Sequence, residues 1–218
     1  LIDLKALYWV GELGLEIEKR DIPEDMLELV EEYRERLISA ASDYDEAVLE
    51  AYLAGEELSA DLLKGALRKG TLQNAIVPVM AGSSFRNKGV QYLLDAIVDY
   101  LPSPTDIPPV QGQRPGSDEV LTRKTSDDEP FSALAFKVMS DPYVGRLTYF
   151  RVYSGSVSAR SSVYNATKGK TERIQRLLLM HANHREDVDE ALAGDIVATV
   201  ALKHTTTGDT LCDEKHPI

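Results

Sequence analysis

The sequence predicts a two-part α/β protein, with a mostly helical part over residues 1–101 and a small antiparallel β-barrel over 117–218. Apolar residues recur at helical spacing through most of the first part, whereas they alternate with polar residues along several short segments of the last part. Between the two, residues 102–116 contain five of the ten prolines, which predicts a stiff, extended linker.

The helical part opens on a capping signal. Asp21 and Glu24 have the spacing of a capping box, which predicts that a helix begins after Asp21. Ser59 predicts the N-cap of a later helix, and Gly55 predicts the end of a shorter one before it. The first helix is indicated by apolar residues at helical spacing, namely Met26, Val30, Tyr33, Leu37 and Ala40.

A change of period follows these helices. Residues 75–81 form an apolar run rich in β-branched side chains, which predicts a buried strand with Pro78 near an edge or a bulge. Residues 82–89 are polar and predict a turn, and the apolar spacing over 90–101 predicts another helix. Strand, loop and helix in this order form the unit from which many α/β ligand sites are built.

The barrel is predicted from strands at near-regular spacing with Gly, Asn and Asp at the turns between them. About 100 residues suffice for one such barrel with its own core. The predicted strands lie at residues 133–139, 146–153, 162–166, 173–180 and 195–202.

Charge is unevenly distributed along the chain. The net charge is −12, and residues 1–100 hold 20 acidic against 10 basic side chains. Residues 131–185 hold nine basic and two acidic side chains, a local balance of +7. A basic segment within an acidic chain favours a phosphate-rich partner, although nine ordinary solvated side chains would give the same count.

Other compositional features exclude several classes. No run approaches the roughly 18 apolar residues that span a bilayer, so no membrane partner is expected. Cys212 is the single cysteine, which forbids an intrachain disulfide and fits a reducing compartment. The sequence begins at Leu1 inside an apolar run, which we interpret as the start of a fragment or a processed piece.

Two short motifs resemble nucleotide-binding motifs, but each lacks a residue that its motif requires. Gly169-Lys170-Thr171 ends like a phosphate-binding loop, but Tyr164 stands where that loop requires glycine. Asn87-Lys88 begins like a guanine-reading box, but Val90 replaces the aspartate that would bind the base. Since the histidines and Cys212 also lack partners at ligand spacing, no catalytic residue and no metal site is predicted.

Longer segments resemble bacterial-type elongation factor G, a translational GTPase, in the order of that family and over nearly the whole chain. These segments are Asp21-Ile-Pro-Glu-Asp25, Gly82-Ser-Ser-Phe-Arg-Asn-Lys-Gly-Val-Gln91, Leu94-Asp-Ala-Ile-Val-Asp-Tyr-Leu-Pro-Ser-Pro104, Gly145-Arg-Leu-Thr-Tyr-Phe-Arg-Val-Tyr-Ser-Gly155, Gly194-Asp-Ile and Thr205-Thr-Thr-Gly-Asp-Thr-Leu-Cys-Asp-Glu-Lys215.

The resemblance implies that residues 1–101 are the tail of the family's P-loop GTP-binding domain, including an acidic helical insertion, and that 117–218 are its second, β-barrel domain. The phosphate loop and the switch segments lie upstream in the family. The complete protein would therefore bind GTP or GDP with Mg²⁺ and hydrolyse GTP. This chain alone is expected to hold no cofactor and to be inactive as an enzyme.

One nucleotide-contacting element is implied within the chain. Ser83, Ser84 and Phe85 occupy the place of the family's guanine loop, in which backbone N–H groups face the guanine oxygen. Ser84 replaces the more usual alanine, a change that leaves the backbone donor in place. A plain turn between a strand and a helix describes the same residues.

The resemblance further implies a cytoplasmic, monomeric module that docks on the ribosome while the complete factor moves tRNA and mRNA. The barrel would contact ribosomal RNA and the acidic insertion a basic ribosomal protein. The predicted RNA-binding residues are Arg146, Arg151, Arg160, Lys168, Lys170, Arg173 and Arg176. Two alternatives are another translational GTPase, such as a release factor or a ribosome-protection protein, and a free-standing α/β-plus-barrel enzyme.

Overall fold

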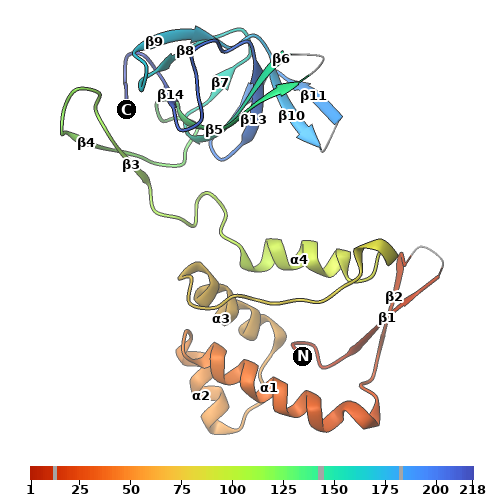
Figure 1. The fold of residues 1–218 in the computed structure, drawn as a ribbon. Helices are drawn as coiled ribbons and strands as arrows, with labels where there is room; N and C mark the ends of the chain where they lie inside the picture. The colour runs from red at the N-terminus through yellow and green to blue at the C-terminus, as the bar shows by residue number, and fades with distance from the viewer. Residues whose placement is uncertain (12–13, 142–144, 182–183) are drawn as a thin grey trace. The chain divides into compact units, whose positions relative to one another are not determined.

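The computed structural model describes residues 1–11, 14–141, 145–181 and 184–218, and divides into two compact units, Leu1–Pro102 and Ser103–Ile218 (Figure 1). Unit 1 holds the four α-helices of the described residues, and the regular secondary structure described in unit 2 consists of strands joined by turns and loops. None of the helices in the described part of the chain has the length and apolarity that crossing a membrane would require.

Unit 1 begins with a β-hairpin that the sequence pattern did not reveal. Strands β1 (Ala6–Val10) and β2 (Glu16–Arg20) pair antiparallel, and the indole of Trp9 meets the ring of Tyr92 edge-on, with the ring centroids 6.2 Å apart. The two short strands alternate only weakly between apolar and polar residues. The hairpin therefore carries little period-two signal.

Of the two predicted N-caps of unit 1, one is confirmed. Ser59 accepts a hydrogen bond from the backbone N–H of Leu62 at 3.2 Å. Asp45, which the sequence analysis did not predict as a cap, accepts one from Ala47 at 3.0 Å. Asp21 does not cap a helix, because its carboxylate pairs with Lys5 at 2.6 Å. The helices are η1 (Glu24–Met26), α1 (Leu27–Ser42), α2 (Glu46–Ala54), α3 (Ala60–Leu72), η2 (Ser84–Arg86) and α4 (Val90–Tyr100).

The core of unit 1 lies among the helices. Ala41 of α1, Val48 of α2 and Leu63 of α3 are completely buried, and Tyr100 of α4 packs into the same cluster. Ile76, just after α3, is partly buried against this cluster. Packing of these apolar faces, rather than helix propensity alone, is what stabilises helices this short.

The predicted buried strand at residues 75–81 is wrong. Residues 76–82 form no strand, and the side chains of Val77 and Val79 are 79% and 89% exposed. A strand needs a neighbour to share its ladder of hydrogen bonds. Within the described part of unit 1, the only two strands already pair with each other. The apolar run is consequently an extended, exposed segment between α3 and η2.

Unit 2 is built on an eight-stranded antiparallel sheet in the order β11-β10-β13-β6-β5-β14-β8-β9, which curls into a barrel-like form (Figure 1). Register shifts between β5 and β6 mark irregularities that bend the sheet. The strands of this sheet are β5 (Ser132–Asp141), β6 (Gly145–Ser154), β8 (Ser162–Asn165), β9 (Lys170–Arg173), β10 (Leu177–His181), β11 (His184–Val188), β13 (Ile196–Val200) and β14 (Thr210–Cys212).

Two further strand pairs complete unit 2. Strand β7 (Val157–Ser158) pairs with β12 (Glu190–Ala191). Strand β3 (Val110–Gln113) pairs with β4 (Val120–Arg123), so that part of the predicted linker at 102–116 is a strand of a hairpin. Gly112 of this hairpin lies against the side chain of Ile218, where a Cβ would come within 2.6 Å of the Ile218 Cγ1.

The core of unit 2 is larger than that of unit 1. Phe150 on β6, Ile174 and Leu177 are completely buried within one cluster of thirteen residues, and a second cluster surrounds Leu147 and Leu178. Cys212 on β14 is also fully buried, and burial raises the pKa of its thiol. The predicted strands all contribute to this core. The predicted strand at 173–180 is wrong as a single strand, because β9 ends at Arg173 and β10 begins at Leu177.

A candidate nucleic-acid interface

Residues 203–209, which form most of the connection from β13 to β14 and are called the 203–209 loop below, are held by buried polar groups. The loop contains the run Thr205-Thr206-Thr207-Gly208-Asp209, of which Thr205 and Asp209 are buried. Gly208 has a φ of +94°, which favours glycine and lets the loop turn back toward β14. The backbone is tied to β5, since the N–H of Gly208 donates to the carbonyl of Ala135 at 2.7 Å.

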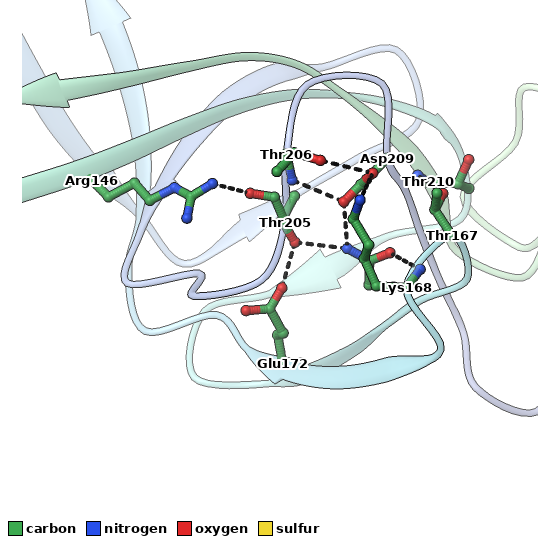
Figure 2. A network of polar contacts seen from close by, with 9 residues as sticks. Arg146, Thr167, Lys168, Glu172, Thr205, Thr206, Asp209 and Thr210 are labelled. Atoms are coloured by element: carbon green, nitrogen blue, oxygen red, sulfur yellow. Dashed lines mark hydrogen bonds and ion pairs between the residues drawn. The ribbon is translucent and has the colours of Figure 1, made fainter.

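Glu172 on β9 binds the start of this loop from below (Figure 2). Its carboxylate accepts hydrogen bonds from the backbone N–H groups of Lys203 and His204 at 2.5 and 2.8 Å, and from the Thr205 hydroxyl at 2.5 Å. Burial by itself would raise the pKa of Glu172. The hydrogen bonds from Thr205, His204 and Lys203 outweigh that effect and hold the pKa below its usual range.

Asp209 binds the other end of the loop. Its carboxylate accepts from the backbone N–H of Thr206 at 2.8 Å and from the side-chain amide of Asn165 at 3.0 Å. The Asn165 amide also donates to the Thr205 hydroxyl at 3.1 Å, which links the two carboxylates into one network (Figure 2). Burial opposes ionisation here too, yet the bonds from Asn165 and Thr206 and the nearby Lys168 lower the pKa of Asp209.

Three of the seven predicted RNA-binding residues gather around this loop. The Lys168 ammonium lies 3.6 Å from the Asp209 carboxylate, and Lys170 lies 3.5 Å from the His204 imidazole. The guanidinium of Arg146 donates to the backbone carbonyls of Lys203, at 3.0 Å, and Thr205. Arg146 therefore holds the loop from the β6 side, while Lys168 and Lys170 are exposed beside it.

The other four predicted residues lie elsewhere on unit 2. Arg176 is committed to a two-bond contact with Asp187, at 2.7 and 2.6 Å. Arg151 lies over the ring of Tyr153, 5.5 Å from its centroid. Arg160 and Arg173 are exposed. They lie at the end of the β8–β9 pair that is farther from Lys170, since Arg173 is opposite Ser162 and Lys170 is opposite Asn165.

Reasoning from the sequence missed the residues that shape the loop. Lys203 and His204 are exposed at its start, but they lie outside the basic segment 131–185 on which the charge count rested. Glu172 and Asn165 were not singled out, because an isolated acid or amide in a strand gives no spacing signal. The signal that was present is the unbroken run of threonines before Gly208 and Asp209.

Ser83, Ser84 and Phe85 form a short turn in unit 1. Ser83 makes a β-bridge with Lys88, with N–H···O distances of 2.8 and 2.9 Å in the two directions, and residues 84–86 form η2. The side chain of Phe85 is completely exposed. The assignment of these residues to guanine binding stays a prediction.

Magnesium is bound by converging oxygen ligands, and the ranges described by the structure contain no group of three acidic, histidine or cysteine side chains that could hold a metal. His181 and His184 are cross-strand partners in the β10–β11 hairpin, without a third ligand in the described residues. That this chain alone holds no GTP, GDP or Mg²⁺ stays a prediction.

Comparison with known proteins finds a family model that matches part of unit 2 and a solved structure that is similar over both units. Residues 130–214, which include the whole loop network, match the model of elongation factor G domain 2. A crystal structure of a protein from Thermus thermophilus is similar over 100% of this chain, with a TM-score of 0.75 and 26% sequence identity. The chain spans 29% of the length of that protein.

Proposed function

We propose that this chain, whose residues 130–214 match the model of elongation factor G domain 2, is the ribosome-docking part of a translational GTPase of that type. The complete factor would hydrolyse GTP and drive the movement of tRNA and mRNA during protein synthesis in the cytoplasm. Unit 2 would contact ribosomal RNA, and the tail of the GTP-binding domain would lie in unit 1.

The observation that carries this proposal is the ordered basic loop within the matched range. Lys168, Lys170 and Lys203 are exposed around a loop that two buried carboxylates hold in place. Helical RNA is recognised mainly through its phosphates and ribose hydroxyls, for which lysine ammonium groups are suitable donors.

A second contact is proposed for the acidic helices of unit 1. Glu28, Glu32 and Glu35 lie on the exposed surface of α1 and would suit a basic ribosomal protein. Acidic helices are commonly just solvated, so this contact is the smaller part of the proposal.

The test is the affinity of the 218-residue chain for purified bacterial ribosomes, measured by sedimentation across a salt series. Where a lysine-to-alanine change removes one phosphate contact, we expect the log–log salt slope to flatten by about 0.7–0.9. A chain that does not sediment with ribosomes at any salt concentration would refute the proposal.

The matched control is a set of acidic substitutions, Glu28→Gln, Glu32→Gln and Glu35→Gln. If these weaken ribosome binding more than any basic variant does, the main contact is to a protein and not to RNA. If the complete protein lacks GTP hydrolysis, the assignment to a translational GTPase fails independently of the docking result.

A further inference from the structure

We propose that Glu172, Asn165 and Asp209 are positioning residues, whose buried network fixes the 203–209 loop so that Lys203, with Lys168 and Lys170 beside it, binds the phosphate backbone of helical RNA. The inference rests on the proposed docking function and assigns it to one loop. It gives two buried acidic side chains an unexpected part in binding an anion.

The network leaves the loop little freedom. Glu172 accepts three hydrogen bonds from consecutive residues, Lys203, His204 and Thr205, so three neighbouring positions are fixed by one carboxylate. Asp209 fixes Thr206 through both its backbone N–H and its hydroxyl, at 2.8 and 3.1 Å. Positions 203–206 are thus each held by one of two buried side chains.

The neighbouring β8–β9 turn is tied to the loop by the same network. The carbonyl oxygen of the Asn165 side chain accepts from the backbone N–H of Lys168 at 2.9 Å, while the amide of the same side chain binds Asp209 and Thr205. One asparagine therefore sets the position of Lys168 relative to the 203–209 loop. Lys170, at the start of β9, completes the group and lies beside His204.

The balance of charge around the loop is positive. Lys168, Lys170, Lys203 and Arg146 supply four positive charges, against the three negative charges of Glu172, Asp209 and the neighbouring Glu214, a balance of +1. Glu172 and Asp209 are only 8% and 3% exposed, whereas the three lysines are on the surface. A phosphate approaching the loop meets the lysines first. Glu214, which accepts from the Thr171 hydroxyl at 3.3 Å, is a nearby exposed acid.

The positioning account and an account based on net charge predict opposite changes in RNA affinity for the substitution Glu172→Gln. Glu172→Gln removes a negative charge, so an account based on net charge alone predicts tighter binding of RNA. The amide cannot replace both acceptor oxygens, so it disrupts the bonding of residues 203–205 and loosens the loop. The positioning account therefore predicts weaker binding, even though the surface has become more positive.

The experiment measures binding of the complete chain to a fluorescein-labelled RNA duplex of arbitrary sequence, longer than about 16 base pairs, by anisotropy. We expect Glu172→Gln to weaken binding by about tenfold, the size of effect that the loss of one hydrogen bond to a buried charged group has. Lys203→Ala should flatten the log–log salt slope by about 0.7–0.9, as the removal of one phosphate contact does.

The matched control is Glu214→Gln, which removes an exposed negative charge next to the same strand and leaves the network intact. It should leave binding unchanged or make it tighter. If Glu172→Gln and Glu214→Gln both tighten binding, the network has no positioning role and the inference is overturned.

Thr205→Val covers the case in which Glu172→Gln does not fold, as judged by its thermal melt. This variant changes no charge, and the positioning account predicts weaker binding, while the charge account predicts no change. If Thr205→Val binds RNA as the unaltered chain does, the inference is overturned.

Ribosome sedimentation separates this inference from the proposed function. If the chain binds ribosomes and the loop variants do not weaken that binding, while Arg160→Ala and Arg173→Ala do, docking stands and the loop assignment fails. If the loop variants weaken binding to ribosomes but not to the RNA duplex, the loop contacts a protein, and the inference also fails.

Discussion

The two units of the chain bury their apolar residues to different extents. Unit 1 buries seven residues in one cluster, while unit 2, of similar length, buries thirteen and four in two clusters. Large apolar side chains stay exposed on α4 of unit 1, with Val98 at 78%, and on the segment that precedes η2. Apolar burial is the main favourable term in folding. The comparison therefore indicates that unit 2 carries more of its own stability.

The two candidate binding loops differ in the same way. The 203–209 loop is fixed by side chains from β8 and β9 that are distant in sequence, whereas the Ser83–Phe85 turn depends on one bridge between Ser83 and Lys88. A loop held by buried, fully bonded polar groups keeps one geometry, because leaving any of these groups unpaired is costly.

The largest expected effect is in the unit 2 core. Phe150→Ala should destabilise unit 2 by about 3–5 kcal/mol, because it removes a completely buried ring. We expect the urea midpoint of the strand-rich unit, followed by circular dichroism, to fall. Trp9, the single tryptophan, lies in unit 1, so its fluorescence transition should stay in place. A joint shift of both transitions would show that the units unfold as one.

The corresponding change in unit 1 should be smaller. Leu63→Ala removes a fully buried side chain from α3, and we expect about 2–3 kcal/mol of destabilisation, because the thinner core can collapse around the gap. The measurement is the urea midpoint of Trp9 fluorescence. A loss equal to or greater than that of Phe150→Ala would reverse the order of stability inferred from the two cores.

Acid should act on unit 2 through the loop network. The pKa values of Glu172 and Asp209 are lowered in the folded chain, so both groups stabilise it above their unfolded pKa values, and this stabilisation is lost as the pH falls through the folded values. We expect a loss on the order of 1 kcal/mol below about pH 4. Melts of unit 2 recorded from pH 7 to 3 test this. Glu172→Gln should flatten the dependence, and an unchanged slope would contradict the assignment.

The smallest expected effect is on the exposed apolar surface of unit 1. Val98→Ser should change the free energy of unfolding by less than about 0.5 kcal/mol, since the side chain is already mostly in water. It should reduce self-association at high concentration, because exposed apolar patches promote it. Light scattering and the Trp9 transition measure the two effects. A large loss of stability would mean that Val98 is buried in solution.

The sequence predicted those elements whose signals are local. The cap at Ser59, the end of α2 at Gly55 and most of the period-two strands of unit 2 depend on neighbouring residues, and the structure contains them. The exception is the predicted strand at 173–180, which is divided between β9 and β10. The run at 75–81 failed because a strand is defined by its partner, which local composition does not encode. The loop network was out of reach for the same reason, since Asn165 and Asp209 meet only after β8 and β14 have paired.

Charge along the sequence predicted two of the exposed basic residues near the 203–209 loop. It could not predict that these residues lie next to one another in the fold. Lys168 and Lys170 gather with Lys203 only through the pairing of strands, while Arg176 is taken up by Asp187 on β11. Whether a given arginine faces an acid across a ladder depends on register, which a charge count along the chain does not contain.

Because Cys212 is buried, the rate at which the chain's single thiol is modified reports how often the sheet around it opens. The thiol is fully buried on β14, which pairs with β5 and β8, and its raised pKa disfavours the reactive thiolate. A thiol-specific reagent can therefore label the chain only when β14 separates from β5 and β8. The labelling rate then measures how often this separation occurs. Since β14 directly follows the 203–209 loop, RNA that docks on the loop would slow the labelling at a site it does not touch.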